Sequence, residues 1–356
     1  MREFTVSSLE AGQRLDKYLF KLLPNAGRNF IYKMLRKKNI TFNNKKADGN
    51  EKVCQGDLVK IYFADETFEK FSGKDKVKND VSKDGLTSDK DIVISKKKSL
   101  PTLDIIYENE DYLFVNKPVG LLSQKADVKD IALVDMIEEY LRQKNGQHFS
   151  TFKAGICNRL DRNTSGIVAA GKSIYGLQKL SEGFRLRTYL KYYITVVKGV
   201  IDKRALITSY LSKDERINKV HIISEQEYRQ CGNKEQYMAI QTEYIPVCSC
   251  DGLTLLKVHL LTGKSHQIRA HLAYIGHPIA GDVKYGDNDF NQYVFHQYHV
   301  NSQMLHAYEL HIPKKSDDKL TQDIIIKTDI PDSFIKVLKG EKIWEHGIQE
   351  VLEALH

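Results

Sequence analysis

A charged stretch poor in large apolar residues, from residue 64 to residue 100, divides this sequence into a short part and a long part. Lys, Asp, Ser, Gly and Thr dominate the stretch, so it offers too little apolar surface to offset the entropy of ordering it. The sequence therefore predicts a flexible linker with an average span of roughly 35 Å. We expect one domain over residues 12–63, a second over 101–330, and a helical tail over 331–356.

The domain at 12–63 is expected to hold two helices followed by short strands. Apolar residues recur at helical spacing from Leu15 to Leu22, and Pro24 ends that helix. A second helix is expected from about Asn29 to Lys38, with strands at 40–42 and 58–63. This second helix and the residue before it present basic side chains, namely Arg28, Lys33, Arg36, Lys37 and Lys38.

The net charge of +8 is concentrated in the same domain. Residues 12–63 carry twelve Lys and Arg against four Asp and Glu, whereas residues 101–356 are neutral overall. A charged helix face is often simply solvated, but a surplus confined to one small module favours a nucleic-acid-binding domain.

Other features exclude several classes of protein. The sequence has no run of 18 apolar residues, and its first residues lack the apolar segment of a secretory signal. The five Cys are scattered, and Cys248 and Cys250 lack a second pair at metal-binding spacing. We therefore expect a cytoplasmic protein with reduced thiols, without a membrane span and without a metal site.

The densest polar cluster of the long part runs from Asn158 to Gly166, between two apolar segments. Within it, Asp161 follows Arg159 closely and directly precedes Arg162. Such a loop can be an ordinary turn, because Asp and Asn bond their own backbone and Gly supplies positive φ. The alternative is a catalytic site, since an ionised Asp can act as a nucleophile or base. The nine residues alone leave both possibilities open.

Residues 166–173 also match the P-loop pattern G-x-x-x-x-G-K-[ST] of nucleotide-binding proteins. A P-loop needs a strand before the motif and an exposed loop within it. Here the inner residues, Ile167 to Ala170, are typical of a strand, and a polar cluster precedes them. The pattern therefore argues against an NTPase.

Five motifs occur in order along the long part: Asn116-Lys117-Pro118, Arg159-Leu160-Asp161-Arg162, Lys191-x-Tyr193, the run Thr262–His271 and the run Gly276–Gly286. Together they resemble the RluA-type pseudouridine synthases of ribosomal RNA, in the branch with an N-terminal S4 RNA-binding domain. The resemblance covers about residues 12–63 and 101–313. It implies an α+β fold, with a small S4-like domain followed by a catalytic domain built on a mixed, largely antiparallel sheet. The implied activity is isomerisation of uridine to pseudouridine in large-subunit ribosomal RNA, by a monomer that needs no cofactor.

The resemblance also implies roles for individual residues. Asp161 would be the catalytic carboxylate, Tyr193 would lie against the uracil and help to remove its C5 proton, and Arg269 would pair with Asp161. Arg162 would fill the place of the flipped-out nucleotide. The other residues expected to bind RNA or substrate are Lys117, Leu272, Arg28, Lys33, Arg36 and Lys37.

One departure from the family pattern concerns Asn158, which stands where the family usually has His. Asn forms hydrogen bonds but cannot carry a proton. This supports an alternative function, an S4-domain RNA-binding or ribosome assembly factor without catalytic activity. The presence of Asp161, Tyr193 and Arg269 favours an active enzyme.

Overall fold

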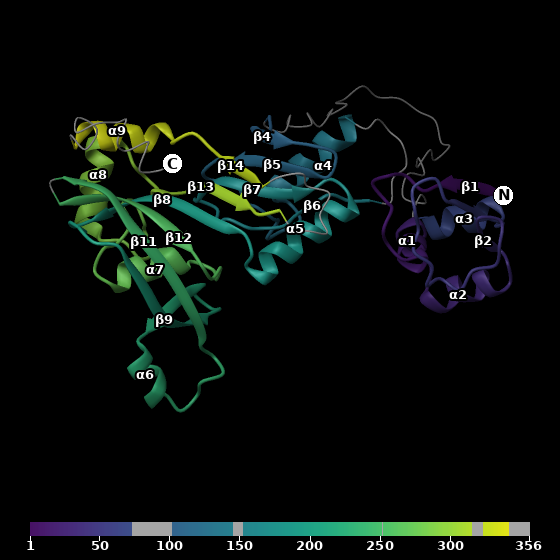
Figure 1. Cartoon of the computed structure of the whole chain (residues 1–356), viewed down its shortest axis with the longest axis horizontal. Helices are drawn as coiled ribbons and strands as arrows, with labels where there is room; N and C mark the ends of the chain where they lie inside the picture. The colour runs from purple at the N-terminus through teal and green to yellow at the C-terminus, as the bar shows by residue number, and fades with distance from the viewer. Residues whose placement is uncertain (73–101, 145–151, 251, 315–322, 342–356) are drawn as a thin grey trace, which may run out of the picture.

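The computed structural model describes residues 1–72, 102–144, 152–250, 252–314 and 323–341. These residues form a small N-terminal unit around a three-stranded sheet and a large unit around an 11-stranded sheet (Figure 1). Each unit has its own hydrophobic core. Most of the predicted linker falls outside the described residues.

The small unit contains the two predicted helices and strands. Antiparallel pairing gives its sheet the order β1-β3-β2. Leu15 and Leu19 of the first helix pack with Ile31 and Leu35 of the second, which confirms the helical spacing read from the sequence. The elements are β1 (Arg2–Thr5), α1 (Leu15–Leu22), α2 (Arg28–Arg36), β2 (Ile40–Phe42), β3 (Leu58–Ile61) and α3 (Asp65–Ser72).

The small unit extends beyond the predicted range of 12–63 at both ends. Strand β1 pairs with β3, and helix α3 inserts the buried Phe68 into the core, where its ring stacks on Phe4 at 5.7 Å. The prediction of a flexible linker was therefore wrong for residues 65–72, because their charged composition masks an apolar face. The surplus of positive charge is also smaller over the whole small unit than over residues 12–63, because residues 1–72 carry fourteen Lys and Arg against nine Asp and Glu.

The large unit is built on one sheet of strand order β10-β9-β11-β12-β8-β13-β7-β5-β4, with β14 paired to β13 and β6 to β7. Its pairs are antiparallel except for β13 and β7, so the predicted mixed, largely antiparallel sheet is confirmed. The strands are β4 (Ile105–Glu108), β5 (Tyr112–Lys117), β6 (Gly155–Ile156), β7 (Ser165–Gly171), β8 (Leu190–Lys198), β9 (Ala205–Asp214), β10 (Lys219–Ile223), β11 (Met238–Cys250), β12 (Leu253–Leu260), β13 (Leu305–Ile312) and β14 (Ile324–Lys327).

Helices cover this sheet through two groups of buried side chains. Four helices contribute to the main core, namely α4 (Leu133–Lys144), α7 (Gln267–Tyr274), α8 (Asn288–Tyr298) and α9 (Asp332–Gly340). Helix α5 (Ile174–Leu186) packs against a second cluster formed with β5, β7, β13 and β14. A short helix, α6 (Glu225–Gln230), follows β10.

The predicted C-terminal tail is part of the large unit where the structure describes it. Phe334, Val337 and Leu338 of α9 are buried in the main core. The helical tail expected at 331–356 is helical at 332–340, but there it is part of the large unit and not a tail outside it. Residues 342–356 lie outside the described part of the chain.

Strand β7 fixes the position of the polar cluster that precedes it. All seven of its residues are buried, and it lies between β5 and β13. Gly166 has φ +111°, and a Cβ atom built there would lie 2.2 Å from the carbonyl oxygen of Ala307. Only glycine therefore permits the close approach of β7 and β13. The inner residues of the P-loop pattern form this buried strand, which excludes a phosphate-binding loop there.

Candidate functional site

Asp161, Arg269 and Asp282 form a chain of ion pairs between three segments of the large unit. Arg269 projects from α7, Asp161 lies in the loop before β7, and Asp282 lies in the loop after α7. Arg269 Nη1 donates to Asp161 Oδ2 over 2.9 Å. Its Nε and Nη2 donate to the two oxygens of Asp282 over 2.7 and 2.9 Å. The contact between Arg269 and Asp161 that the resemblance implies is thus present.

The two carboxylates differ in their exposure. The Asp282 side chain is 0% exposed and that of Arg269 is 7% exposed, whereas that of Asp161 is 27% exposed. Burial opposes the ionisation of Asp282, but the hydrogen bonds and charge of Arg269 outweigh it and lower the pKa of that carboxyl. Two carboxylates and one guanidinium leave a net charge of −1, and Asp161 is the end that solvent can reach.

Asp161 has an oxygen to offer a substrate. Its Oδ2 accepts the Arg269 bond, and no described residue forms a hydrogen bond with its Oδ1. Because Asp282 binds one edge of the guanidinium through two hydrogen bonds, the guanidinium of Arg269 has a fixed orientation and holds the Asp161 carboxylate in one orientation.

Tyr193 and Tyr192 of β8 point to opposite faces of the sheet, as strand geometry predicts. Tyr192 stacks on His259 with ring centroids 4.8 Å apart, away from the carboxylates. Tyr193 belongs to the main core with Leu160, the residue before Asp161. Burial raises the pKa of Tyr193, and the charge of Asp161 raises it further. Its phenol is therefore protonated at neutral pH.

Two residues expected to bind RNA or substrate are buried instead. Lys117 is fully buried, and its Nζ donates to the carbonyl oxygens of Pro118, Leu121 and Arg162 over 2.9–3.0 Å. All three ammonium protons are thus used within the protein, and Lys117 holds two loops together. Leu272 is also fully buried, in the main core. Both assignments are corrected, because neither side chain reaches the surface.

Arg162 is exposed, and its backbone is held firmly. Its carbonyl oxygen accepts from Lys117 Nζ at 3.0 Å and from the amide of Gly120 at 2.9 Å. The side chain donates from Nε to the carbonyl oxygen of Gly120 over 3.1 Å. Arg162 therefore reaches solvent from a fixed position beside Asp161.

The other predicted RNA-binding residues lie on or next to α2, in the small unit. All four are exposed, and no ion pair among the described residues involves them. The structure therefore does not group them with the Asp161 site, and they form a separate basic face made of Arg28, Lys33, Arg36 and Lys37.

Asn158 joins the polar cluster to β7 through both ends of its amide. Its Nδ2 donates to the carbonyl oxygen of Ile167 over 3.1 Å, and its Oδ1 accepts from the amide of Ala169 over 2.8 Å. These bonds occupy the edge of β7 beyond its short pairing with β13. Asn158 therefore attaches the polar cluster to the backbone of β7. It takes no part in the ion pairs of Arg269 with Asp161 and Asp282, so these do not need a titratable group at position 158.

Three residues near Asp161 were not predicted as functional: Asp282, His266 and Tyr285. His266 Nε2 lies 4.0 Å from Asp161 Oδ2, and its Nδ1 lies 2.9 Å from Tyr285 Oη. All three belong to the two runs that carried the family resemblance, Thr262–His271 and Gly276–Gly286. That membership was a signal, but nothing in their spacing indicates that they converge on a residue more than one hundred positions earlier.

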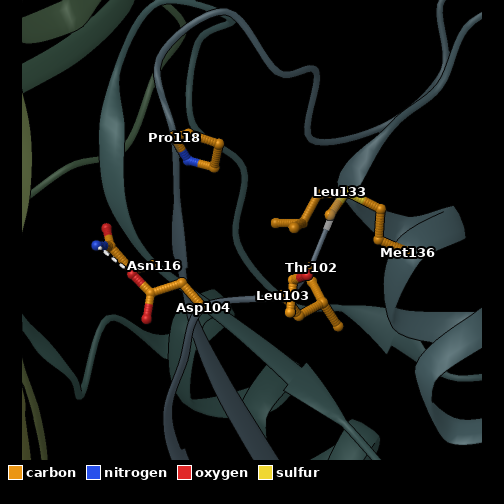
Figure 2. Close-up of a pocket in the computed structure, with 7 residues that line it drawn as sticks. All are labelled: Thr102, Leu103, Asp104, Asn116, Pro118, Leu133 and Met136. Atoms are coloured by element: carbon orange, nitrogen blue, oxygen red, sulfur yellow. Dashed lines mark hydrogen bonds between the residues drawn. The ribbon is translucent and has the colours of Figure 1, made fainter. Parts of the chain in front are cut away.

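A cavity of about 200 Å³ lies beside the end of β5, outside this cluster (Figure 2). Leu133 and Met136 of α4 line it, and so do Asn116 and Asp104, which are joined by a hydrogen bond of 2.9 Å. None of the residues that bind Asp161 lines it, so it is distinct from the carboxylate site. Among the described residues, no group of His, Cys, Asp or Glu is arranged to hold a metal ion, and no helix is long and apolar enough to cross a membrane.

Comparison with known proteins identifies the family. The sequence profile of the RNA pseudouridylate synthases matches residues 111–274. The chain is 28% identical to ribosomal large subunit pseudouridine synthase C of Haemophilus influenzae, over 87% of this chain and 86% of that protein. It is 30% identical to the protein of the same name from Rickettsia felis, over 79% of this chain and 85% of that protein. The chain belongs to the RNA pseudouridylate synthase family.

The fold agrees with this membership. The structure of human RNA Pseudouridylate Synthase Domain Containing 4 is 18% identical and superposes with a TM-score of 0.53, over 67% of this chain and 93% of that one. As a member of the family, the chain is a pseudouridine synthase, an isomerase that acts on RNA. The alternative of a non-catalytic RNA-binding factor is not favoured, and Asn158, its sole support, has a structural role.

Asp161 and Asp282 make a matched pair for a test, because both accept hydrogen bonds from Arg269. We expect Asp282→Asn to lower the free energy of unfolding by about 3 kcal/mol, since it leaves a buried charge without its main partner. Asp161→Asn should change it by less than about 1 kcal/mol, because Arg269 stays paired with Asp282. Urea unfolding followed by circular dichroism measures both. Equal losses would show that Asp282 is not the anchor of this cluster.

Proposed function

We propose that this synthase modifies uridine in large-subunit ribosomal RNA and that Asp161 is its catalytic carboxylate. The observation that carries the role of Asp161 is its position as the exposed end of an otherwise buried chain of ion pairs. The relatives named as ribosomal large subunit synthases, matched over most of both chains, support the choice of RNA.

The reaction needs little beyond an oriented anion beside the sugar. Isomerisation breaks the bond between uracil N1 and ribose C1′, forms a bond between C5 and C1′, and moves one proton from C5 to N1. The base leaves and is recaptured in the same site, so no second substrate is consumed. Asp161 acts at the sugar, either by attack on C1′ or by removal of a sugar proton, and both routes require the ionised carboxylate.

Tyr193 is proposed to line the uracil site as a neutral phenol. It packs in the main core with Leu160, the residue before Asp161, and burial raises the pKa of its phenol. A phenol with a raised pKa does not rest as a phenolate at neutral pH. We therefore assign Tyr193 to packing against the base, and not to acting as a phenolate that removes the C5 proton.

The first test concerns the charge of Asp161. We expect Asp161→Asn to bind RNA with unchanged affinity and to form pseudouridine at least about 1,000-fold more slowly, because it loses the nucleophile or base while Arg269 stays in place. Release of tritium from RNA labelled at uracil C5 measures turnover. Appreciable turnover by this variant would remove Asp161 from the mechanism.

The small unit is proposed to be an S4-like RNA-binding module that anchors the enzyme. Its second helix presents Arg28, Lys33 and Arg36 to solvent, and Lys37 is exposed directly after the end of the helix. Cations that neutralise phosphates release counterions, and this makes RNA affinity depend on salt. A basic face held on a rigid helix is suited to such contacts.

Lys33, Arg36 and Lys37 can be tested together against an equally charged control. We expect their replacement by Gln to weaken RNA binding and to reduce the slope of log affinity against log salt by about 0.7–0.9 for each phosphate that is no longer neutralised. The control replaces Lys45, Lys46 and Lys52, which are exposed in the same unit but outside α2. If both triple variants lower the slope equally, then net charge and not α2 binds the RNA.

Arg162 is proposed to occupy the place that the target uridine leaves in the RNA. Chemistry at C1′ and C5 requires the nucleotide to leave its stack, which costs a few kcal/mol. A planar cation that stacks and forms hydrogen bonds suits the vacated position. Arg162 has an exposed side chain on a fixed backbone next to Asp161, as this role requires.

This proposal predicts that the effect of Arg162→Ala depends on RNA structure. We expect activity on a folded RNA to fall at least about tenfold more than activity on an RNA whose target uridine is already unstacked, since only the first substrate needs the gap filled. Turnover of the two substrates by the wild type and the variant measures this ratio. Equal losses would make Arg162 a general phosphate contact.

A further inference from the structure

His266 lies beside Asp161 in an unusual backbone conformation. It precedes α7, with φ 55° and ψ 12°, a left-handed conformation that few non-glycine residues adopt. Its side chain is 10% exposed, and its Nε2 lies 4.0 Å from Asp161 Oδ2. Strained conformations of this kind persist where surrounding contacts require them, and they occur often at functional sites.

Tyr285 determines which nitrogen of His266 carries the proton. Tyr285 Oη accepts a hydrogen bond from the amide of Val220 over 2.8 Å. Among the described residues, His266 Nδ1, 2.9 Å away, is the acceptor placed for the single hydroxyl proton. The ring proton then resides on Nε2, where the negative charge of Asp161 also favours it. Two independent contacts therefore select the tautomer with Nε2–H directed toward Asp161.

The ring of His266 is neutral at physiological pH. Burial lowers its pKa, and the charge of Asp161 opposes this without reversing it. The cations of Arg269 and Lys284 lower the pKa further, whereas Asp282 acts in the opposite direction. His266 therefore presents one fixed N–H donor and no free proton for acid catalysis.

The distance between Nε2 and Asp161 Oδ2 indicates what this donor binds. At 4.0 Å the two atoms are too far apart for a direct hydrogen bond, which needs about 2.7–3.2 Å. A single oxygen atom about 2.8 Å from each would lie to one side of the line that joins them and bridge the two. Since Nε2–H donates and the carboxylate accepts, that oxygen must both accept and donate, as a hydroxyl group does.

We propose that His266 and Asp161 together hold the ribose 2′-hydroxyl of the target uridine, with Tyr285 fixing His266 as the donor. The 2′-hydroxyl is attached to the carbon next to C1′, so it is the substrate hydroxyl closest to where Asp161 acts. This rests on the proposed role of Asp161 at the sugar. It makes His266 a substrate-binding residue and Tyr285 a positioning residue.

The site is also connected to the edge of the sheet. Val220 belongs to β10, and Lys219 of the same strand places its Nζ 5.6 Å from the centre of the Tyr285 ring. Arg269 Cζ lies 5.2 Å from the same ring centre. Tyr285 is thus held by an edge strand and by the central guanidinium, which fixes the hydroxyl that orients His266.

Variants of His266 and a substrate lacking the 2′-hydroxyl test the proposal together. The side chain of His266→Gln can carry an amide N–H to the position of Nε2, whereas that of His266→Asn reaches only the position of Nδ1. Binding of each protein is measured to RNA with uridine, and to RNA with 2′-deoxyuridine, at the target position. The wild type should bind the 2′-deoxy RNA at least roughly three- to tenfold more weakly, because the bonds to His266 and to Asp161 are both lost.

The expected result is non-additive. In His266→Asn the uridine RNA should bind more weakly than it does to the wild type, and the 2′-deoxy substitution should have a smaller effect than in the wild type, because only the bond to Asp161 remains. His266→Gln should retain most of the discrimination. An undiminished 2′-deoxy effect in His266→Asn would overturn the proposal, and so would a wild type that binds both RNAs equally.

Tyr285→Phe provides an independent measurement, because it leaves the His266 backbone unchanged. It should reduce the 2′-deoxy effect, because the Nε2–H tautomer of His266 is then no longer fixed by Tyr285. This measurement tests the proposal even if His266→Asn does not fold. A full 2′-deoxy effect in Tyr285→Phe would show that Tyr285 does not position His266. Failure here is distinct from failure of Asp161 as the catalytic group, which the turnover of Asp161→Asn reports separately.

Discussion

The site depends on the buried ion pair between Arg269 and Asp282. A guanidinium held by two parallel hydrogen bonds has a fixed plane, and its remaining nitrogen then fixes the direction of any further acceptor. Asp161 is that acceptor. The charges of Arg269 and Asp282 compensate each other inside the protein. The charge that a substrate can reach is therefore the one on Asp161. The orientation of this carboxylate is therefore set in advance of substrate binding, at the expense of a costly buried charge pair.

The fold around this pair brings together parts of the sequence that are far apart. Strand β7 lies close to β13 because Gly166 permits the approach, and the Asp161 loop leads into the end of β7 that pairs with β13. Helix α7 follows β12 and carries Arg269 to the same end. Lys117 ties the loop after β5 to the carbonyl group of Arg162, so the residue after Asp161 is also fixed. Strand β7, helix α7 and the loop after β5 thus hold the site in place.

Much of this could be predicted from the sequence, and the rest could not for identifiable reasons. Helical spacing located α1 and α2, and the apolar run Ile167 to Ala170 indicated a strand. Helix α3 and strand β1 were missed because their apolar residues are few, and their burial depends on partners elsewhere in the small unit. The family motifs pointed to Asp161 and Arg269. Lys117 was assigned to RNA or substrate binding from its place in a family motif, and its burial follows from three carbonyl groups that only the folded loops bring together.

The two hydrogen bonds of Asn158 have a consequence for how the loop before β7 responds to pH. The position requires one donor and one acceptor to satisfy Ile167 and Ala169 of β7, between the residues of this strand that pair with β13 and those that pair with β6. The oxygen and nitrogen of the Asn amide are both bonded to the same carbon, close to the backbone, and together they meet both partners. Because an amide does not titrate, the attachment of the loop to β7 at this position does not depend on pH.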